Sequence, residues 1–355
     1  VWTGGLVRED ATRIPELVLA PRLEAPLRTL LFRHHTRSDR GLLCAPRWAE
    51  VPEAFRADWI ARLARERLET KTARLADRYL RRPALDQLLY ERLFAGLGYA
   101  KNAEAMETLA RRLPLDTVRA IADSLDREAL FFGAAGLLPA PGDLLESDRA
   151  TADYVVDLHT RFRRLNARLS VAPMERTQWT FFRLRPANFP TLRIAQGASL
   201  FGSEGLLHHD PVGRLAEALS SSEPVDALRT ALAARPPAFW QTHLRLAKST
   251  KPRDPSLGRS RIDTLIVNAV LPVLLLHAEQ TTRPDLAEHA FDVLRKLPPG
   301  RDSILRRFAD LGTRPRSAFE AQGLHRLYRH YCREGRCLSC AIGRSVLETE
   351  EQTNG

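Results

Sequence analysis

The stretch Tyr331-Cys332-Arg333-Glu334-Gly335-Arg336-Cys337-Leu338-Ser339-Cys340 constrains the fold more than any other part of the sequence. It holds three of the four cysteines, and the fourth, Cys44, lies almost a whole chain length upstream. A site that used all four would tie the two ends of the fold together. Gly335 lets the backbone turn back and bring Cys332 beside the other two. We therefore predict one site built from Cys44, Cys332, Cys337 and Cys340.

The spacing of these cysteines, C-x4-C-x2-C with one remote partner, is typical of metal centres. Four thiolates satisfy either a tetrahedral zinc ion or an iron–sulfur cluster. Zinc sites usually combine two C-x2-C pairs and this chain has one, so an iron–sulfur cluster of the 4Fe–4S type is favoured, with zinc as the alternative. The local spacing equals that of plant-type ferredoxins, but the fourth cysteine lies upstream, which favours a structural role. Buried cysteines without a ligand are the remaining possibility.

Composition and charge bound the class of protein. With 355 residues, of which 44% are hydrophobic, the chain can bury a large core and form one large domain or two ordinary ones. A formal net charge of +11 favours nucleic acid or another anionic partner, because Lys and Arg neutralise phosphates. Nearly all of this charge is Arg, which a GC-rich genome would also place on any protein surface. The basic excess alone leaves a functional and a solubilising role equally open.

The apolar segments argue against a membrane span. The longest run, 265–277, is interrupted by Asn268 and Pro272 and is shorter than the roughly 20 residues that cross a bilayer. It is typical of a buried helix. No signal peptide is recognisable, and clustered cysteines in intracellular proteins more often bind metal than form disulfides. We expect a cytoplasmic protein without membrane contact.

Apolar residues recur at three- and four-residue spacing through most of the chain, which predicts a mainly α fold. The expected helices cover 53–80, 85–97, 102–113, 115–121, 127–132, 151–169, 190–201, 262–276, 285–297, 303–311 and 318–331. Residues 14–19 look like a strand, so a small β/α element is expected at the N-terminal end. The predicted organisation is the end of an α/β region with its linker over 1–45, a large helical array over 46–346 whose ends are tied by the four-cysteine metal site, and a disordered tail over 347–355.

The first candidate phosphate site is the segment 179–193. Its polar candidates are Arg183, Arg185, Asn188 and Arg193. Asn188 is a predicted N-cap, and Pro190 suits the first turn of the helix that follows. Free backbone N–H groups at a helix N-terminus attract anions, so this segment predicts an anion site. The alternative is a rigid turn that seats three aromatic residues, Trp179, Phe182 and Phe189, in the core.

The second candidate phosphate site is the basic connection 248–261. Lys251, Arg259 and Arg261 are its candidates, and Ser260-Arg261-Ile262-Asp263 matches a capping box that opens the next helix. Positive charge again precedes a helix N-terminus. Two such segments favour an extended phosphate-binding surface for DNA or RNA.

Three motifs together resemble one family. They are Leu184-Arg185-Pro186-Ala187-Asn188-Phe189-Pro190, the helix entry from Leu257-Gly258 through Asn268 to Pro272, and Tyr331-Cys332 with Cys337-Leu338-Ser339-Cys340-Ala341-Ile342-Gly343. With these motifs the chain resembles the uncharacterised bacterial family called domain of unknown function 2851, over essentially its whole length. The resemblance implies a fold and no established activity.

The same resemblance implies a neighbouring nuclease. Fuller-length members of that family carry an N-terminal α/β stretch similar to a restriction-endonuclease-type, PD-(D/E)xK, core, and this chain is expected to begin just after it. Some DNA-repair and adaptive-immunity nucleases of that superfamily have one cysteine before the core and three after it, clamped by a 4Fe–4S cluster. The cysteine order here is similar, although Cys44 would follow the core.

These features favour a nucleic-acid-binding or processing accessory protein, the C-terminal part of a nuclease-like factor with a structural iron–sulfur cluster. No nucleophile–base pair or carboxylate pair is recognisable, so no catalytic residue is assigned. The alternative is a zinc-stapled helical scaffold for protein interactions, whose arginines only keep the surface soluble.

Overall fold

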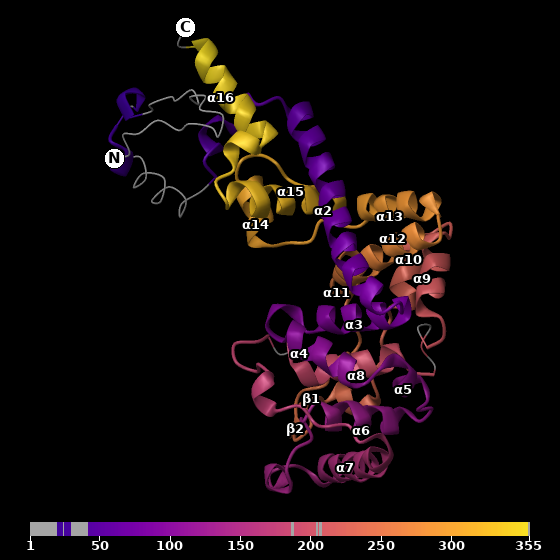
Figure 1. The fold of residues 1–355 in the computed structure, drawn as a ribbon. Helices are drawn as coiled ribbons and strands as arrows, with labels where there is room; N and C mark the ends of the chain where they lie inside the picture. Colours follow the sequence, from indigo (N-terminus) through magenta and orange to yellow (C-terminus); the bar gives the residue numbers. More distant parts are fainter. Residues whose placement is uncertain are drawn as a thin grey trace, which may run out of the picture.

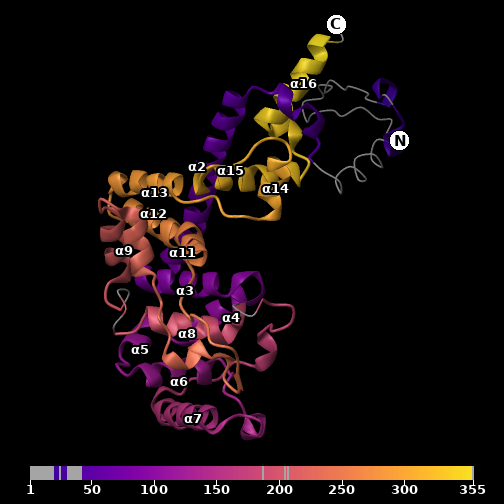
Figure 2. The ribbon, with the colours of Figure 1, turned by 180° about the vertical axis from the view of Figure 1, so that it is seen from behind.

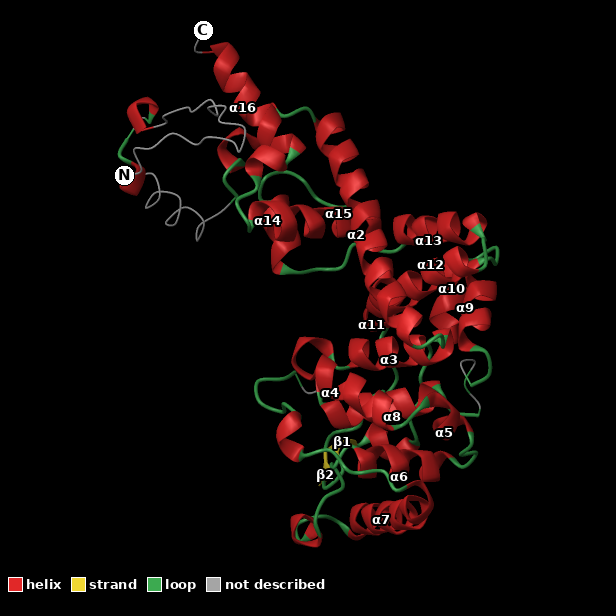
Figure 3. Ribbon diagram, viewed as in Figure 1, coloured by secondary structure: helices red, strands yellow, loops and turns green. Residues whose placement is uncertain are grey.

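The computed structural model describes residues 20–23, 25–29, 42–185, 188–203, 205 and 208–353. The β/α element predicted at the N-terminal end lies outside these residues. The described chain is mainly helical (Figure 3), which confirms the predicted mainly α class.

The α-helices follow one another with short connections. They are α2 (Glu53–Arg81), α3 (Leu85–Leu97), α4 (Tyr99–Arg112), α5 (Leu115–Arg119), α6 (Ser124–Ala134), α7 (Arg149–Leu169), α8 (Pro190–Leu200), α9 (Pro211–Leu219), α10 (Pro224–Ala231), α11 (Arg259–Leu265), α12 (Leu271–Gln280), α13 (Pro284–Lys296), α14 (Ser303–Ala309), α15 (Ala318–Arg326) and α16 (Ala341–Thr353).

Shorter helical turns connect them. Two are π-helical, namely η7 (Ile266–Val270) and η8 (Leu327–Cys332). The 3-10 turns are η1 (Ala20–Arg22), η2 (Ala45–Glu50), η3 (Pro141–Leu144), η4 (Arg176–Gln178), η6 (Ala238–Gln241) and η9 (Cys337–Ser339).

The described residues form one small sheet. It is an antiparallel hairpin of β1 (His243–Arg245) and β2 (Lys248–Ser249), in which His243 pairs with Ser249 and Arg245 with Lys248. Strands of three and two residues are too short to show an alternating pattern, which is why the sequence does not predict them.

The long helix α2 runs from the end of the molecule with α14 to α16 toward α3 (Figures 1 and 2). It contributes residues to two hydrophobic cores. Its first half contributes Ile60 and Leu63 to a smaller core, which also contains residues of η2, α14, α15, η8 and α16. Its second half contributes Leu68 and Leu75 to a larger core, built by α3 to α13. The helical array predicted over 46–346 therefore contains two packed regions along one long helix.

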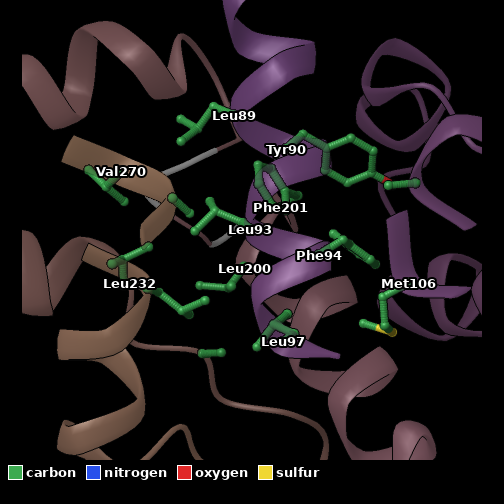
Figure 4. Packing of buried hydrophobic residues seen from close by; sticks show 14 of the residues in the cluster. Leu89, Tyr90, Leu93, Phe94, Leu97, Met106, Leu200, Phe201, Leu232 and Val270 are labelled. Atoms are coloured by element: carbon green, nitrogen blue, oxygen red, sulfur yellow. The ribbon is translucent and has the colours of Figure 1, made fainter. Parts of the chain in front are cut away.

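The larger core is organised around α3 (Figure 4). The Tyr90 ring lies 4.8 Å from that of Phe94 and 4.9 Å from that of Phe201, centroid to centroid, both edge to face. Leu93 and Val270 fill the space between α3 and η7. Edge-to-face aromatic pairs add to the stabilisation that burial alone provides.

The predicted start of the helix over 102–113 is wrong. Gly98 has an ordinary φ of −71°, whereas the following residue, Tyr99, has a φ of 55° and starts α4. Asn102 lies inside α4 instead of capping it. Its side chain accepts from the backbone N–H of Thr180 at 2.8 Å and donates to the Thr180 carbonyl oxygen at 2.9 Å. Asn102 therefore fixes the start of the loop that leads to α8.

The predicted buried helix 262–276 is confirmed as the continuous run of α11, η7 and α12. Among the described residues, Arg259–Gln280 is a helix long and apolar enough to cross a membrane, and 72% of its apolar window is buried inside the protein. At the other end, α16 continues to Thr353, where the sequence predicts a disordered tail over 347–355.

The contact between α2 and α15 depends on Gly323. A methyl group at Gly323 would lie 2.1 Å from the backbone oxygen of Ile60. We predict that Gly323→Ala lowers the free energy of unfolding by roughly 1–3 kcal/mol, because overpacking pushes the two helices apart. The urea midpoint measures this change. Gly142→Ala is the control, since nothing lies within 4 Å of that position, and equal midpoints for the two variants would contradict the prediction.

Candidate functional site

The four predicted cysteines line one cavity. Cys44 directly precedes η2, Cys332 ends η8, Cys337 begins η9, and Cys340 follows η9. The other residues around the cavity are Trp48, Leu327, Tyr331, Ile342 and Gly343. The structure thus brings together all four candidate ligands from the two ends of the described helical chain.

Two glycines let the C-terminal cysteines approach one another. Gly335 has a φ of 65°, and its backbone N–H donates to the Cys332 carbonyl oxygen at 3.3 Å, which confirms the predicted reversal of the chain. A methyl group at Gly343 would lie 2.3 Å from the Cys337 carbonyl oxygen. The start of α16 can therefore pack directly against η9.

The two ends are also held by contacts that need no metal. Arg47 donates to the Val346 carbonyl oxygen at 2.8 Å, and the Trp48 indole N–H donates to the Thr313 hydroxyl at 2.9 Å. The Trp48 ring lies 5.6 Å from that of Phe308, centroid to centroid. Residues 44–48 are therefore fixed on the smaller core, beside the last cysteines.

Cys340 is buried, the other three cysteines are partly buried, and the thiols influence one another. Burial raises the pKa of Cys44 to about 11, and the nearby charges of Cys340 and Cys337 add to the rise. Burial also raises the pKa of Cys332, followed by the charges of the other three cysteines. Ionised thiolates would repel one another here, so a bound cation would stabilise the form that ligates metal.

The four cysteines share a cavity, but their arrangement does not show the predicted metal site. The cavity has a volume of about 10 Å³, which is roughly the space of one water molecule. Within the described ranges, no three His, Cys, Asp or Glu side chains converge as a group that could hold one metal ion. A zinc ion needs its thiolates within about 2.3 Å of one point, whereas a cluster spreads its thiolates over several irons. The volume therefore suits a single ion better than a cluster.

Arg193, from the first predicted phosphate site, lies inside the protein. Arg193 is only 5% exposed to solvent. It donates to Gln196 at 2.7 Å, to the Tyr99 hydroxyl at 3.0 Å and to the Asn188 side chain at 3.1 Å. Burial lowers the pKa of Arg193 to about 10. The prediction that Arg193 contacts phosphate at the surface is therefore wrong. Arg193 instead holds the turn that precedes α8.

Arg261, from the second predicted site, reaches the same tyrosine. Its guanidinium carbon lies 3.0 Å from the centroid of the Tyr99 ring, and one nitrogen donates to the Gly96 carbonyl oxygen at 3.3 Å. Burial lowers the pKa of Arg261 to about 10. In the described part of the chain, neither Arg193 nor Arg261 has a carboxylate partner, and the Nε atom of each is buried without a hydrogen bond.

The two basic segments therefore meet at Tyr99, which the sequence does not show. Cation–π contact and hydrogen bonds to neutral oxygens offset only part of the cost of burying the two arginine charges. Tyr99 carries a positive φ, a conformation that costs free energy in a non-glycine residue and persists where surrounding contacts enforce it. A glycine immediately before an aromatic residue is too common a signal to have predicted this arrangement.

The other predicted phosphate contacts lie at the surface. Arg183, Arg185, Lys251 and Arg259 are exposed. Arg259 lies 3.8 Å from Asp226, a loose ion pair. Asn188 does not cap α8, because Phe189 occupies that position and the Asn188 side chain accepts from Arg193. Ser260 does not form the predicted capping box, since α11 begins at Arg259 after Gly258.

The aromatic residues of the first segment are divided between core and surface. Trp179 is buried and donates to the Ala135 carbonyl oxygen at 2.8 Å. Phe182 is 73% exposed, and the Arg183 guanidinium lies 5.1 Å from its ring centroid. The rigid-turn interpretation therefore holds for Trp179, while Phe182 and Arg183 form an exposed pair on which a base can stack.

A cavity of about 690 Å³ lies elsewhere, between α3, α5 and α9. Its charged groups are largely paired. Asp86 accepts from Arg119 at 3.0 Å and from the backbone N–H of Val212 at 3.1 Å. None of the residues singled out in the sequence lines this cavity.

Fold and site together define a mainly helical protein with a four-cysteine cavity at one end and converging arginines at its centre. A family profile described as "Protein of unknown function (DUF2851)" matches residues 4–303. The chain belongs to this family. The matched stretch contains Cys44 and both basic segments, and it ends before the other three cysteines. No curated protein and no solved structure matches the chain.

Proposed function

We propose that this chain is a cytoplasmic nucleic-acid-binding protein. The observation that carries the proposal is the meeting of two basic segments at Tyr99, with arginines that lack carboxylate partners in the described residues. Arg193 and Arg261 bring the two segments together from inside, and the exposed basic residues of those segments are the ones that a phosphate backbone can contact. Exposed Arg183, Arg185, Lys251 and Arg259 flank the meeting point in sequence, and Phe182 offers a stacking surface for an unpaired base.

A structural metal centre at Cys44, Cys332, Cys337 and Cys340 completes the proposal, with a 4Fe–4S cluster favoured. The four cysteines on one apolar cavity support a metal centre, and the presence of only one C-x2-C pair favours a cluster over zinc. Its place in the smaller core makes it a staple between the start and the end of the helical chain. Kinship with iron–sulfur-stapled PD-(D/E)xK nucleases rests on the order of the cysteines alone, and the proposed role of this chain is that of an accessory region.

Neutralising the exposed basic residues tests the proposed binding. For the variant with Arg183→Gln, Arg185→Gln and Arg259→Gln, we predict a loss of affinity for a duplex or single-stranded oligonucleotide of roughly 30-fold. The slope of log affinity against log salt should fall by about 3 in magnitude, near one per lost phosphate contact. Fluorescence anisotropy at several salt concentrations measures both.

The control removes the same charge from a remote helix. It carries Arg149→Gln, Arg163→Gln and Arg168→Gln, all exposed on α7. Affinity equal to that of the control, or no salt-dependent binding of DNA or RNA by the wild-type protein at low ionic strength, rejects the proposal.

A zinc-stapled scaffold without a nucleic-acid role is the second candidate. The observation in its favour is the cavity of about 10 Å³, which suits one ion better than a cluster. This candidate predicts bound zinc, loss of the folded smaller core on chelation, and no affinity for nucleic acid.

A further inference from the structure

Lys71 is held by two neutral side chains near the middle of α2. Its Nζ donates to the Asn268 side-chain oxygen at 2.8 Å and to the Gln322 side-chain oxygen at 2.9 Å. Asn268 belongs to η7 and Gln322 to α15. The lysine thus lies between two elements that are distant in sequence, η7 and α15.

Further cations surround Lys71. Arg67, one helical turn earlier, donates to the same Gln322 oxygen at 2.9 Å. Burial lowers the pKa of Lys71 well below its usual range, and the like charges of Arg67, Arg329 and Arg92 lower it further. Burial lowers the pKa of Arg67 to about 10, followed by the charge of Arg329. The cluster therefore combines concentrated positive charge with limited hydration.

The carboxylates of this region do not neutralise the cluster. Glu66 accepts from Arg326 at 3.2 Å, and Glu107 accepts from Arg78 at 2.7 Å. In the part of the chain that the structure describes, Lys71 and Arg67 have only amide partners on their side chains, and Arg329 has neither a hydrogen bond nor an ion pair. Arg329 is also exposed, so the cluster is open to solvent. Gathering like charges without a counter-charge is costly unless an anion binds.

Two rare backbone features contribute residues to the cluster. Asn268 lies in the π-helical turn η7, and Arg329 lies in the π-helical turn η8. π-helical turns inside α-helices are uncommon and are frequently found at functional sites. The turns η7 and η8 both lie beside α2. Their π-helical geometry is an observation independent of the charges.

Through Asn268, the cluster lies on the same helical run as the partly buried Arg261. Arg261, Thr264 and Asn268 follow one another at helical spacing, and the Asn268 amide donates to the Thr264 carbonyl oxygen at 2.9 Å. Seven residues of helix span roughly 10 Å at about 1.5 Å per residue. That length is about three steps of a nucleic-acid strand at roughly 3.4 Å each. One strand could therefore pass both groups of cations.

We propose that Lys71, Arg67 and Arg329 bind a phosphate group, which in the proposed function belongs to the bound nucleic-acid strand, and that Gln322 and Asn268 hold the cations in place. The ammonium of Lys71 acts as a compact charge at the base of the site. The exposed guanidinium of Arg329 can make two parallel hydrogen bonds to the phosphate oxygens.

The first arm of the test uses inorganic pyrophosphate and the intact chain. Reductive ¹³C-methylation of the lysines, followed by NMR, reports the pKa of each amine, and pyrophosphate should raise that of Lys71. Lys296, which is exposed on α13, should show no such change. This arm does not depend on nucleic acid, so it tests the phosphate site apart from the proposed function.

The second arm measures oligonucleotide affinity by anisotropy. Lys71→Gln and Arg329→Gln should each weaken binding roughly tenfold and reduce the salt slope by about 1, whereas Lys296→Gln should change neither. Arg329 is exposed, so its variant keeps the test valid where Lys71→Gln impairs folding. Pyrophosphate binding without oligonucleotide binding supports the site, assigns it to a free phosphate compound and rejects the proposed function. Oligonucleotide binding unaffected by either variant, with no response of Lys71 to pyrophosphate, overturns the site alone.

Discussion

Cys44→Ser is expected to remove at least about nine-tenths of the metal from protein purified without oxygen. Loss of a direct ligand should exceed the roughly 10-fold to 100-fold effect that loss of a supporting residue has on metal affinity. Metal and sulfide analysis, together with the visible absorbance of an iron–sulfur cluster, gives the measurement. Ser339→Ala is the control, because Ser339 lies between two of the candidate ligands, is exposed, and has no thiol.

The damage should be local. The cavity belongs to the smaller core. That core contains Cys340, and Cys44 packs against it. Hydrogen exchange should therefore rise over η2, η8 and η9 and remain low in α3, which lies at the centre of the larger core. The bond from Arg47 to the Val346 carbonyl oxygen should keep part of the connection intact.

Three results separate the possibilities for this site. Iron and sulfide in the wild-type protein, lost in Cys44→Ser, support the cluster. Zinc in their place supports the scaffold. Wild-type protein without either metal, when purified under anaerobic conditions, would falsify the metal centre and leave four thiols that serve only as packing.

The helices and the cysteine site could be predicted because each depends on short-range patterns. Apolar spacing identified α2 and α3 nearly to the residue, since one buried stripe suffices to define an amphipathic helix. The cysteines could be grouped because thiol chemistry makes residue type informative at any separation in sequence. Neither inference required knowledge of which helices touch.

The features that were missed depend on contacts between distant segments. Asn102 is a residue type that local preference places at a helix start, but α4 begins at Tyr99 and the Asn102 side chain bonds the backbone of Thr180 instead. A π-helical turn leaves no mark in apolar spacing. Lys71 lies on what the pattern indicates is the solvated face of α2, and only η7 and α15 make it part of a site.

For the predicted phosphate sites, the sequence identified the basic segments but not the burial of their arginines. The basic segments were identified from charge next to helix starts, and the structure places Arg193 and Arg261 on one tyrosine. Their burial could not be predicted, because an arginine has the same sequence signature on a surface and in a core. Tertiary position therefore decides which cations can reach a ligand.

Glu128 is expected to make stability depend on pH. Its carboxyl is buried in the larger region and accepts from the Trp240 indole N–H and from the Tyr154 hydroxyl, both at 2.9 Å. Burial raises the pKa of Glu128 to about 7, although these two hydrogen bonds act in the opposite direction. The folded protein therefore holds a neutral carboxylic acid at pH values where the unfolded chain holds a carboxylate.

The direction of the effect follows from the raised pKa. The contribution of Glu128 to stability is fully present below the unfolded pKa, near 4.5, and is lost as the pH rises through about 7. A difference of about 2.5 pKa units corresponds to roughly 3 kcal/mol. Glu128→Gln, which keeps an oxygen for both donors and cannot ionise, should match the wild-type free energy of unfolding near pH 4.5 and exceed it by roughly that amount above pH 8. Urea titrations of both proteins at the two pH values measure this change, and a difference that is the same at both would show that Glu128 titrates normally.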